Sequence, residues 1–286
     1  MTSCSNDSVR RCRPLLGTFV EVTAWGEPAR LDRAVDAAFA AVTRVQTLMS
    51  FHDPASELSC LNREAACRAV TVDAWTSHVL ATAKEIAGAS DGAFDPTVAP
   101  VLQRWGLLPD LPLRKPGGWR DLELLSGHQV RFGRPLTLDL GGIAKGFAVD
   151  CAVAALQANG AESGLVNAGG DLRAFGPRAQ PVQLRDPGSP GRLAHGFRLQ
   201  NAALATSAPT FSRSEGGGIV VSHLVDPATG SAFVAHVSVS VRAPTCLLAD
   251  ALTKVVFFGG PGAESVLARY DAEAFVLAAE AMPLAA

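Results

Sequence analysis

The sequence has no long apolar segment and no strong excess of charge. In 286 residues with a net charge of −2, no apolar run approaches the roughly 20 residues of a membrane-spanning helix. A nearly neutral chain also argues against a dedicated nucleic-acid binder, which normally carries a basic face. Residues 1–14 contain arginines but no apolar segment after them, so the sequence as it begins predicts a cytoplasmic protein. A periplasmic location remains an alternative if an export segment was removed.

The familiar spacings of metal sites and disulfide frameworks are missing too. The six cysteines form no CxxC pair, which fits a reducing compartment or a protein without disulfides. The six histidines form no HExxH pair, so a zinc site is disfavoured. The glycine-containing stretch at residues 137–150 matches neither the Walker loop nor the GxGxxG fingerprint, which excludes these two nucleotide-binding motifs.

That stretch, residues 137–150, nevertheless indicates a strand, a glycine turn and a helix. Gly141 and Gly142 allow backbone conformations that a side chain would block, and apolar residues recur at helical spacing from Ile143 onward. A glycine turn that opens a helix leaves N–H groups free to bind phosphate, and Lys145 adds a positive charge one turn into the helix. An ordinary strand-to-helix turn explains the same residues, so both interpretations stay open here.

The rest of the chain mixes helices and strands without a regular βαβ rhythm, which predicts a single α+β unit. We expect residues 1–14 to form an N-terminal tail and residues 15–286 to form the domain. Helical spacing predicts helices over residues 32–49, 72–89, 143–158, 244–258 and 263–270. Alternation predicts strands that include residues 16–25, 129–132, 136–139, 163–176, 219–225, 233–241 and 274–277. Asp95 and Pro96 are predicted to begin a further helix as N-cap and first helical residue.

Seven short motifs occur in order along the chain, each of them weak alone. They are Leu16-Gly-Thr, Ser56-Glu-Leu with Asn62, Gly92-Ala-Phe-Asp-Pro-Thr-Val, Leu138-Asp-Leu-Gly-Gly-Ile-Ala-Lys-Gly, Asn167-Ala-Gly-Gly-Asp171, His223-Leu-Val-Asp-Pro-Ala-Thr-Gly230 and Ala249-Asp-Ala-Leu252. Together they resemble the motifs of the ApbE family, the FAD:protein FMN transferases, and the resemblance covers the chain from Leu16 to about Gly260.

The resemblance implies an α+β fold related to the T-fold, with two lobes and a central ligand cleft. It implies FAD as the substrate, bound between the lobes with Mg²⁺ on its pyrophosphate. FMN would pass to a Thr or Ser hydroxyl of an acceptor flavoprotein, with release of AMP. Two other functions stay open: an FAD-binding carrier or sensor without transfer activity, and a metal-dependent FAD pyrophosphatase.

The resemblance also assigns roles to individual residues. The carboxylate of Asp250 and the carbonyl of Gly142 would hold the metal, since magnesium prefers oxygen ligands. His223 resembles the histidine proposed as general base toward the acceptor hydroxyl. Contacts with FAD are expected at Leu16, Phe51, Ala93, Phe94, Asp95, Asp139, Lys145 and Leu224. From the residues alone, Asp250 fits a solvated helix carboxylate equally well, and a lone strand histidine is more often structural.

Three positions depart from the family pattern. Lys254 stands where the family usually has a threonine that ligates the metal, and an ammonium group cannot ligate a cation. Lys254 could instead act in catalysis as a fixed charge near the pyrophosphate, or it could turn away while the neighbouring Thr253 completes the metal site. Phe51 replaces a common tyrosine, and residues 207–211 replace a Ser-Gly-Asp-Tyr pattern, which puts acceptor binding in doubt.

Overall fold

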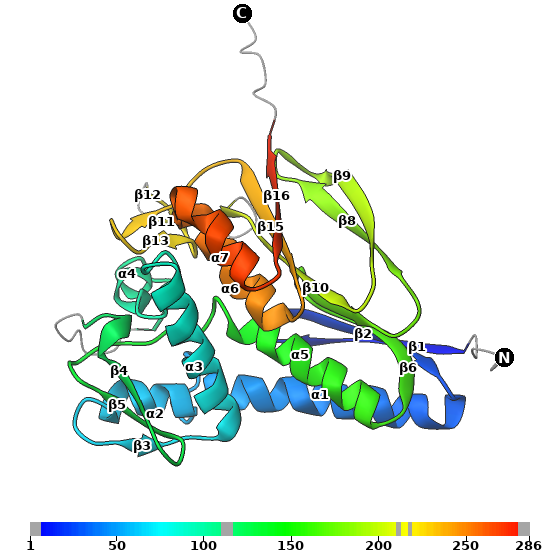
Figure 1. The fold of residues 1–286 in the computed structure, drawn as a ribbon, viewed down its shortest axis with the longest axis horizontal. Helices are drawn as coiled ribbons and strands as arrows, with labels where there is room; N and C mark the ends of the chain where they lie inside the picture. The colour runs from blue at the N-terminus through cyan, green and yellow to red at the C-terminus, as the bar shows by residue number, and fades with distance from the viewer. Residues whose placement is uncertain (1–6, 110–116, 210–212, 217–218, 280–286) are drawn as a thin grey trace, which may run out of the picture.

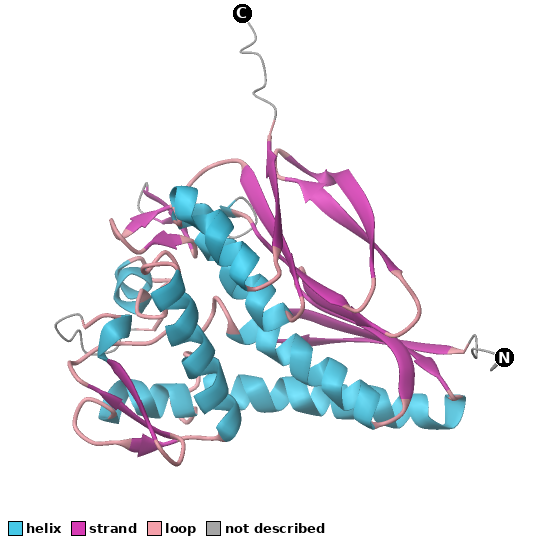
Figure 2. Cartoon of the chain, viewed as in Figure 1, coloured by secondary structure: helices cyan, strands magenta, loops and turns pink. Residues whose placement is uncertain are grey.

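A seven-stranded antiparallel sheet forms the larger of two lobes (Figures 1 and 2). The computed structural model describes residues 7–109, 117–209, 213–216 and 219–279. In spatial order the sheet contains β1 (Ser8–Leu15), β2 (Thr18–Gly26), β6 (Ala161–Ala168), β7 (Asp171–Phe175), β10 (Ala202–Ser207), β15 (Val237–Ala243) and β16 (Glu273–Ala278). Each neighbouring pair runs antiparallel.

Helices pack against one face of this sheet (Figure 1). They are α1 (Pro28–Met49), α5 (Ala144–Ala158) and α6 (Cys246–Phe258), and α7 (Ala263–Arg269) lies against α6. In α1, buried apolar residues recur every three or four positions, which makes one face of the helix fit the core. The helix starts at Pro28, four residues before the predicted start, because proline is favourable in the first turn.

The smaller lobe is built around α3 (Ala74–Ala89) and lies beside the C-terminal half of α1 (Figure 1). It also contains α2 (Glu57–Glu64), α4 (Ala99–Arg104), η1 (Trp119–Asp121) and a three-stranded sheet in the order β3 (Val70–Thr71), β5 (Gln129–Phe132) and β4 (Leu122–Leu125). Two of its helices begin at side-chain caps: Ser56 accepts a hydrogen bond from Ser59, and Asp73 accepts one from Trp75.

Three small hairpins complete the described structure. They pair β8 (Gln180–Asp186) with β9 (Ser189–Leu199), β11 (Arg213–Gly216) with β12 (Ile219–Ser222), and β13 (Val225–Asp226) with β14 (Ser231–Ala232). A short turn, η3 (Gly260–Gly262), joins α6 to α7. The β13–β14 hairpin makes its turn at residues 227–230, between the strands predicted over residues 219–225 and 233–241. Among the described residues, no helix is long and apolar enough to cross a membrane.

One hydrophobic cluster runs through both lobes. It contains Val22 of β2, Val45 of α1, Leu61 of α2, Ile86 of α3 and Leu252 of α6, each with an exposed fraction of zero. A second, smaller cluster lies between the β8–β9 hairpin and the central strands of the sheet. Because α1 contributes to the packing of both lobes, the lobes share one core.

Several sequence predictions differ from the structure. Residues 8–14 of the predicted tail belong to the edge strand β1, in which Arg11 and Arg13 bind acidic residues of α1. The strand has no buried residue, so its sequence lacks the apolar alternation by which strands are predicted. Residues 163–176 form a hairpin, β6–β7, and not one broken strand. Residues 136–139 form a loop. Asp95 forms a turn with Thr97, and the helix begins later, at Ala99.

Candidate active site

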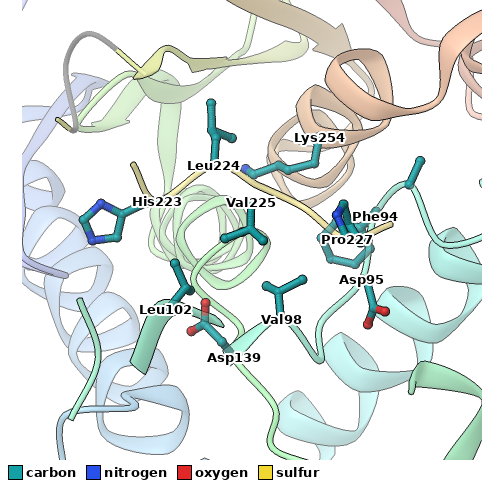
Figure 3. A pocket seen from close by; sticks show the side chains of 12 residues that line it. Phe94, Asp95, Val98, Leu102, Asp139, His223, Leu224, Val225, Pro227 and Lys254 are labelled. Atoms are coloured by element: carbon teal, nitrogen blue, oxygen red, sulfur yellow. The ribbon is translucent and has the colours of Figure 1, made fainter. Parts of the chain in front are cut away.

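A pocket opens between the two lobes, at the N-terminal end of α5 (Figure 3). Its wall on the smaller lobe comes from the segment before and within α4, and the opposite wall comes from α6 and the link between β12 and β13. The lining residues are Ala93, Phe94, Asp95, Val98, Leu102, Asp139, Gly142, His223, Leu224, Val225, Pro227 and Lys254. Eight of the predicted site residues therefore meet here, although they come from four separate parts of the sequence.

The loop before α5 is held in place by a buried side chain of α2. The amide of Asn62 donates to the carbonyl of Leu138 at 3.0 Å and accepts from the N–H of Leu138 at 2.8 Å. The next residue, Asp139, donates its N–H to the carbonyl of Pro96 at 2.8 Å and accepts from the N–H of Gly141 at 3.0 Å. Burial raises the pKa of Asp139, against the effect of this hydrogen bond. These hydrogen bonds fix the position of the Asp139 carboxyl group at the pocket.

The wall of the smaller lobe is a tight turn that directs Phe94 into the pocket (Figure 3). Gly92 has a φ of +86°, which few other residues adopt, and the N–H of Phe94 donates to Ser90 Oγ at 3.2 Å. Asp95 accepts hydrogen bonds from the N–H and the hydroxyl of Thr97, at 2.8 and 2.7 Å. Burial raises the pKa of Asp95, and the bonds from Thr97 act against it. Asp95 therefore shapes the turn as well as lining the pocket.

A chain of alternating charges lies between α5, β7 and α6. Lys145 forms a close ion pair with Asp171 and lies 4.0 Å from Asp250 Oδ2. Lys254 Nζ donates to Asp250 Oδ1 at 2.5 Å and to the carbonyl of Asp250 at 2.9 Å. The N–H of Gly146 donates to Asp250 Oδ2 at 3.2 Å. Both carboxylates are buried, and only the two lysine side chains retain some exposure, 36% for Lys145 and 18% for Lys254.

Their surroundings give the two carboxylates different acidities. Burial, together with the nearby charge of Asp250, raises the pKa of Asp171 to about 6, although Lys145 acts against this. Burial alone would raise the pKa of Asp250 as well, but Lys145 and Lys254 together hold it below its ordinary value. Both carboxylates raise the pKa of Lys145 in spite of its burial, so this lysine stays charged. Asp250 is accordingly an ionised group with an ammonium on each side.

Helices α5 and α6 approach each other closely beside this cluster. A Cβ atom on Gly146 would lie 2.2 Å from the carbonyl oxygen of Cys246, so only glycine fits there. Further along α5, the carboxylate of Asp150 accepts hydrogen bonds from the N–H groups of Cys246 and Leu247, at 2.9 and 2.8 Å. Asp150 also binds Arg173 at 2.7 Å. These contacts fix the start of α6, and with it the positions of Asp250 and Lys254.

His223 and Leu224 line the pocket from the link between β12 and β13. Leu224 is buried, donates its N–H to Ser222 Oγ at 3.1 Å and accepts from the N–H of Phe233 at 2.9 Å. The side chain of His223 is exposed at the edge of the pocket (Figure 3). An exposed imidazole at a pocket edge can meet a second molecule there and exchange a proton with it.

The other predicted site residues lie outside the pocket lining. Leu16 has a φ of 56° in the β1–β2 turn and donates its N–H to Gln46. Phe51 is 8% exposed and belongs to the core. Thr253 is fully buried, donates to the carbonyl of Asp250 at 2.7 Å and shares a hydrogen bond with Ser207 at 2.8 Å. Its hydroxyl thus has two protein partners and does not line the pocket. Of residues 207–211, the segment that differs from the family's Ser-Gly-Asp-Tyr pattern, residues 210–211 lie outside the described part of the chain.

Three residues that hold the site together were not among the predicted site residues. Asn62 and Asp171 stand in two of the motifs, but nothing in the sequence says what they touch. Asp150 ends the stretch that opens α5, and its partners on α6 lie about a hundred residues later. These contacts join segments that are far apart in the sequence, and local sequence patterns do not predict such contacts.

The fold and the pocket together define a class of protein. They describe an α+β protein with a ligand cleft between two lobes, in which an aromatic ring, a glycine turn and an ammonium group meet. The chain belongs to the ApbE family, whose family model matches residues 16–276. The predicted family and the predicted α+β fold are thereby confirmed.

Similar proteins have consistent names. A protein of Rhodobacter capsulatus named FAD:protein FMN transferase is 32% identical over 265 residues, which cover 86% of this chain and 50% of that protein. The chain therefore spans about half the length of this relative. A protein of Treponema pallidum with the same name is 29% identical, with 87% of this chain and 78% of the relative covered. The crystal structure of an ApbE protein from Thermotoga maritima superimposes with a TM-score of 0.85 at 26% identity, covering 96% and 97% of the two chains.

Proposed function

We propose that the protein is an FAD:protein FMN transferase, an enzyme that moves FMN from FAD to a hydroxyl group of an acceptor flavoprotein and releases AMP. The observation that carries this proposal is the meeting of Phe94, Gly142 of the turn before α5, and Lys254 around one pocket. A dinucleotide such as FAD combines aromatic rings with a pyrophosphate, and this pocket offers a partner for each. The shared name of the curated relatives supports the same activity.

In this proposal the two walls of the pocket bind different parts of FAD. Phe94 and Leu224 would contact a ring system, since apolar side chains face the pocket from both sides. The turn at Gly141 and Gly142 and the ammonium group of Lys254 would face the pyrophosphate, because a helix start and a positive charge both favour anions. Asp139 would orient the nucleotide through its carboxyl group.

The chemistry is a displacement at phosphorus. The acceptor hydroxyl oxygen, from a Thr or Ser side chain, attacks the phosphorus atom of the FMN half. A new P–O bond forms, the bridging P–O bond of the pyrophosphate breaks, and AMP leaves. His223, exposed at the edge of the pocket, would take the proton of the hydroxyl group. Fixed positive groups would stabilise the charge that spreads over the phosphoryl oxygens.

The family resemblance implies Mg²⁺, and the residues present do not fit it well. Asp250 Oδ1 already accepts from Lys254 at 2.5 Å, and Oδ2 accepts from the N–H of Gly146 at 3.2 Å. The buried hydroxyl of Thr253 is hydrogen-bonded to the carbonyl of Asp250 and to the hydroxyl of Ser207. We therefore assign no step to a metal.

The function can be tested with purified components. The protein is mixed with FAD and a panel of acceptor domains that carry a Thr, a Ser or an Ala at the flavinylation position. Flavin fluorescence on the acceptor in a denaturing gel, together with AMP in solution, is the expected result for the Thr or Ser acceptors only. AMP with free FMN and no labelled acceptor would favour the pyrophosphatase, and bound FAD without either product would favour the carrier.

A further inference from the structure

The ammonium group of Lys254 lies at the pocket with one hydrogen available for a ligand. Two of its three N–H donors bind the carboxylate and the carbonyl of Asp250, on the same helix. The side chain is 18% exposed and lines the pocket, beside Leu224 in Figure 3. The remaining N–H is thus free to meet an anion in the pocket.

The lysine side chain also fills the space between Gly142 and Asp250. A Cβ atom built on Gly142 would lie 3.2 Å from Lys254 Cε and 3.7 Å from Nζ. Lys254 thus lies against Gly142 and also binds the carboxylate of Asp250, the two residues to which the family resemblance assigns the metal. A metal ion at these two residues would therefore compete with the Lys254 ammonium group for the Asp250 carboxylate.

The charges of the cluster are already balanced. Asp171 and Asp250 supply two negative charges, and Lys145 and Lys254 supply two positive ones, all within ion-pairing distance of a neighbour. A divalent cation added to this cluster would bring two further positive charges with no carboxylate left to bind them. A buried charge without a partner is strongly unfavourable, and both carboxylates of the cluster are already paired with lysines, so the cluster offers no unpaired carboxylate to a further cation.

We propose that Lys254 is the resident cation of this site, and that the protein binds the pyrophosphate of FAD without a divalent metal. The proposal rests on the function proposed above, because it concerns how the same site holds the same substrate. Asp250 then has a different task from metal binding: it holds the ammonium group in position. Asp250 and Gly146 fix that position from two helices.

The test compares FAD binding with and without metal. Protein freed of metal by EDTA is titrated with FAD in EDTA and again in MgCl₂, and flavin fluorescence or calorimetry gives Kd. The same titrations are done on Lys254→Thr, which offers an oxygen ligand, and on Lys254→Met, which keeps the length of the side chain without a charge or an oxygen. Arg192→Gln, an exposed residue on β9, is the control for loss of one positive charge. Circular dichroism melts verify that each variant is folded.

We expect the wild-type protein and Arg192→Gln to have the same Kd in EDTA and in MgCl₂. Both Lys254 variants should bind FAD at least about tenfold more weakly in EDTA, the loss expected for one charge-assisted hydrogen bond. MgCl₂ should restore binding in Lys254→Thr but not in Lys254→Met. Calorimetry with Mg²⁺ alone should show binding to Lys254→Thr and none to the wild-type protein.

Two results would overturn the proposal: wild-type binding of FAD that is lost in EDTA and restored by Mg²⁺, or a Lys254→Met variant that binds FAD as tightly as the wild-type protein. Either result leaves the transferase function intact. Metal-independent FAD binding without any labelled acceptor would support the role of Lys254 and remove the transferase function instead. A wild-type protein that binds no FAD in either buffer would overturn both.

Discussion

The side-chain amide of Asn62 makes two hydrogen bonds with the backbone of Leu138, donating to its carbonyl and accepting from its N–H, as the backbone of a neighbouring strand would. Both residues are buried, so the two backbone groups of Leu138 have no water to replace the amide. The pair joins α2 of the smaller lobe to the loop that carries Asp139 into the pocket. The geometry of the pocket therefore depends on a residue that lies outside it.

Replacing this amide should affect both stability and ligand binding. Asn62→Ala leaves the buried N–H and carbonyl of Leu138 without partners, which should lower the free energy of unfolding by about 2 kcal/mol or more. FAD affinity should fall as well, because the loop at Asp139 loses its anchor. Asn159→Ala, at the partly buried C-terminus of α5, is the control and should cost about 0.5 kcal/mol or less. Urea unfolding and FAD titration measure the two effects, and unchanged unfolding of Asn62→Ala would contradict the first.

The close contact of α5 and α6 predicts opposite effects for two glycine substitutions. Gly146→Ala forces a methyl group against the Cys246 carbonyl and should destabilise the protein by about 2–3 kcal/mol, since the helices must move apart. In Gly88→Ala the new methyl group would lie 3.6 Å from the ring of Trp119, an ordinary contact, within α3. This second change should stabilise by about 0.5–1 kcal/mol, because alanine favours helix more than glycine does. Thermal melts compare the two, and equal melting temperatures would refute the steric argument.

The raised pKa of Asp171 predicts how stability changes with pH. Its carboxyl group has a pKa of about 6 in the folded protein against a model value of 3.8. Between these values the folded state binds more protons than the unfolded state, so this group makes the free energy of unfolding fall as pH rises, by at most about 1.4 kcal/mol per pH unit. In Asp171→Asn this contribution should disappear, whereas Asp32→Asn, an exposed control, should keep it. Unfolding measured from pH 4 to 7 decides, and an unchanged slope in Asp171→Asn would mean that Lys145 keeps Asp171 ionised throughout.

The position of His223 at the edge of the pocket predicts a separation of binding from chemistry. His223→Ala should reduce FMN transfer by about a hundredfold or more while FAD affinity stays the same, because the proposed role of this pocket-lining histidine is to take the proton of the acceptor hydroxyl and not to bind FAD. His236→Ala, another exposed histidine, should leave both unchanged. Single-turnover transfer and FAD titration give the two numbers. Equal losses of binding and transfer in His223→Ala would indicate a structural histidine.

Local signals in the sequence were sufficient for much of the fold. The apolar spacing of α1, the extent of α3 and the glycine turn before α5 all appear as predicted, with ends that differ by a few residues. These features depend on neighbours within one or two turns, and the sequence displays such neighbours directly. Eight of the predicted site residues line one pocket. They were predictable from the family motifs, and no periodicity in the sequence indicated them.

The features that the sequence did not predict depend on distant partners. The sequence predicts a tail where strand β1 lies, because its arginines interrupt the apolar alternation; their partners Asp32 and Asp36 lie on α1. The ion pair of Lys145 with Asp171 joins residues 26 positions apart, and the contact of Asp150 with α6 joins residues almost a hundred apart. Thr253 and Lys254 differ by one position on α6, yet one is buried and the other lines the pocket, which only the packed helix decides.

The shared core has a consequence for how the cleft behaves. Because α1 and one continuous apolar cluster support both walls, neither lobe can swing outward without exposing buried side chains to water. The protein should consequently unfold in a single cooperative transition, and a bound ligand should raise the melting temperature of the whole chain. The affinity of the cleft for its ligand should then carry no cost for closing a hinge between the lobes.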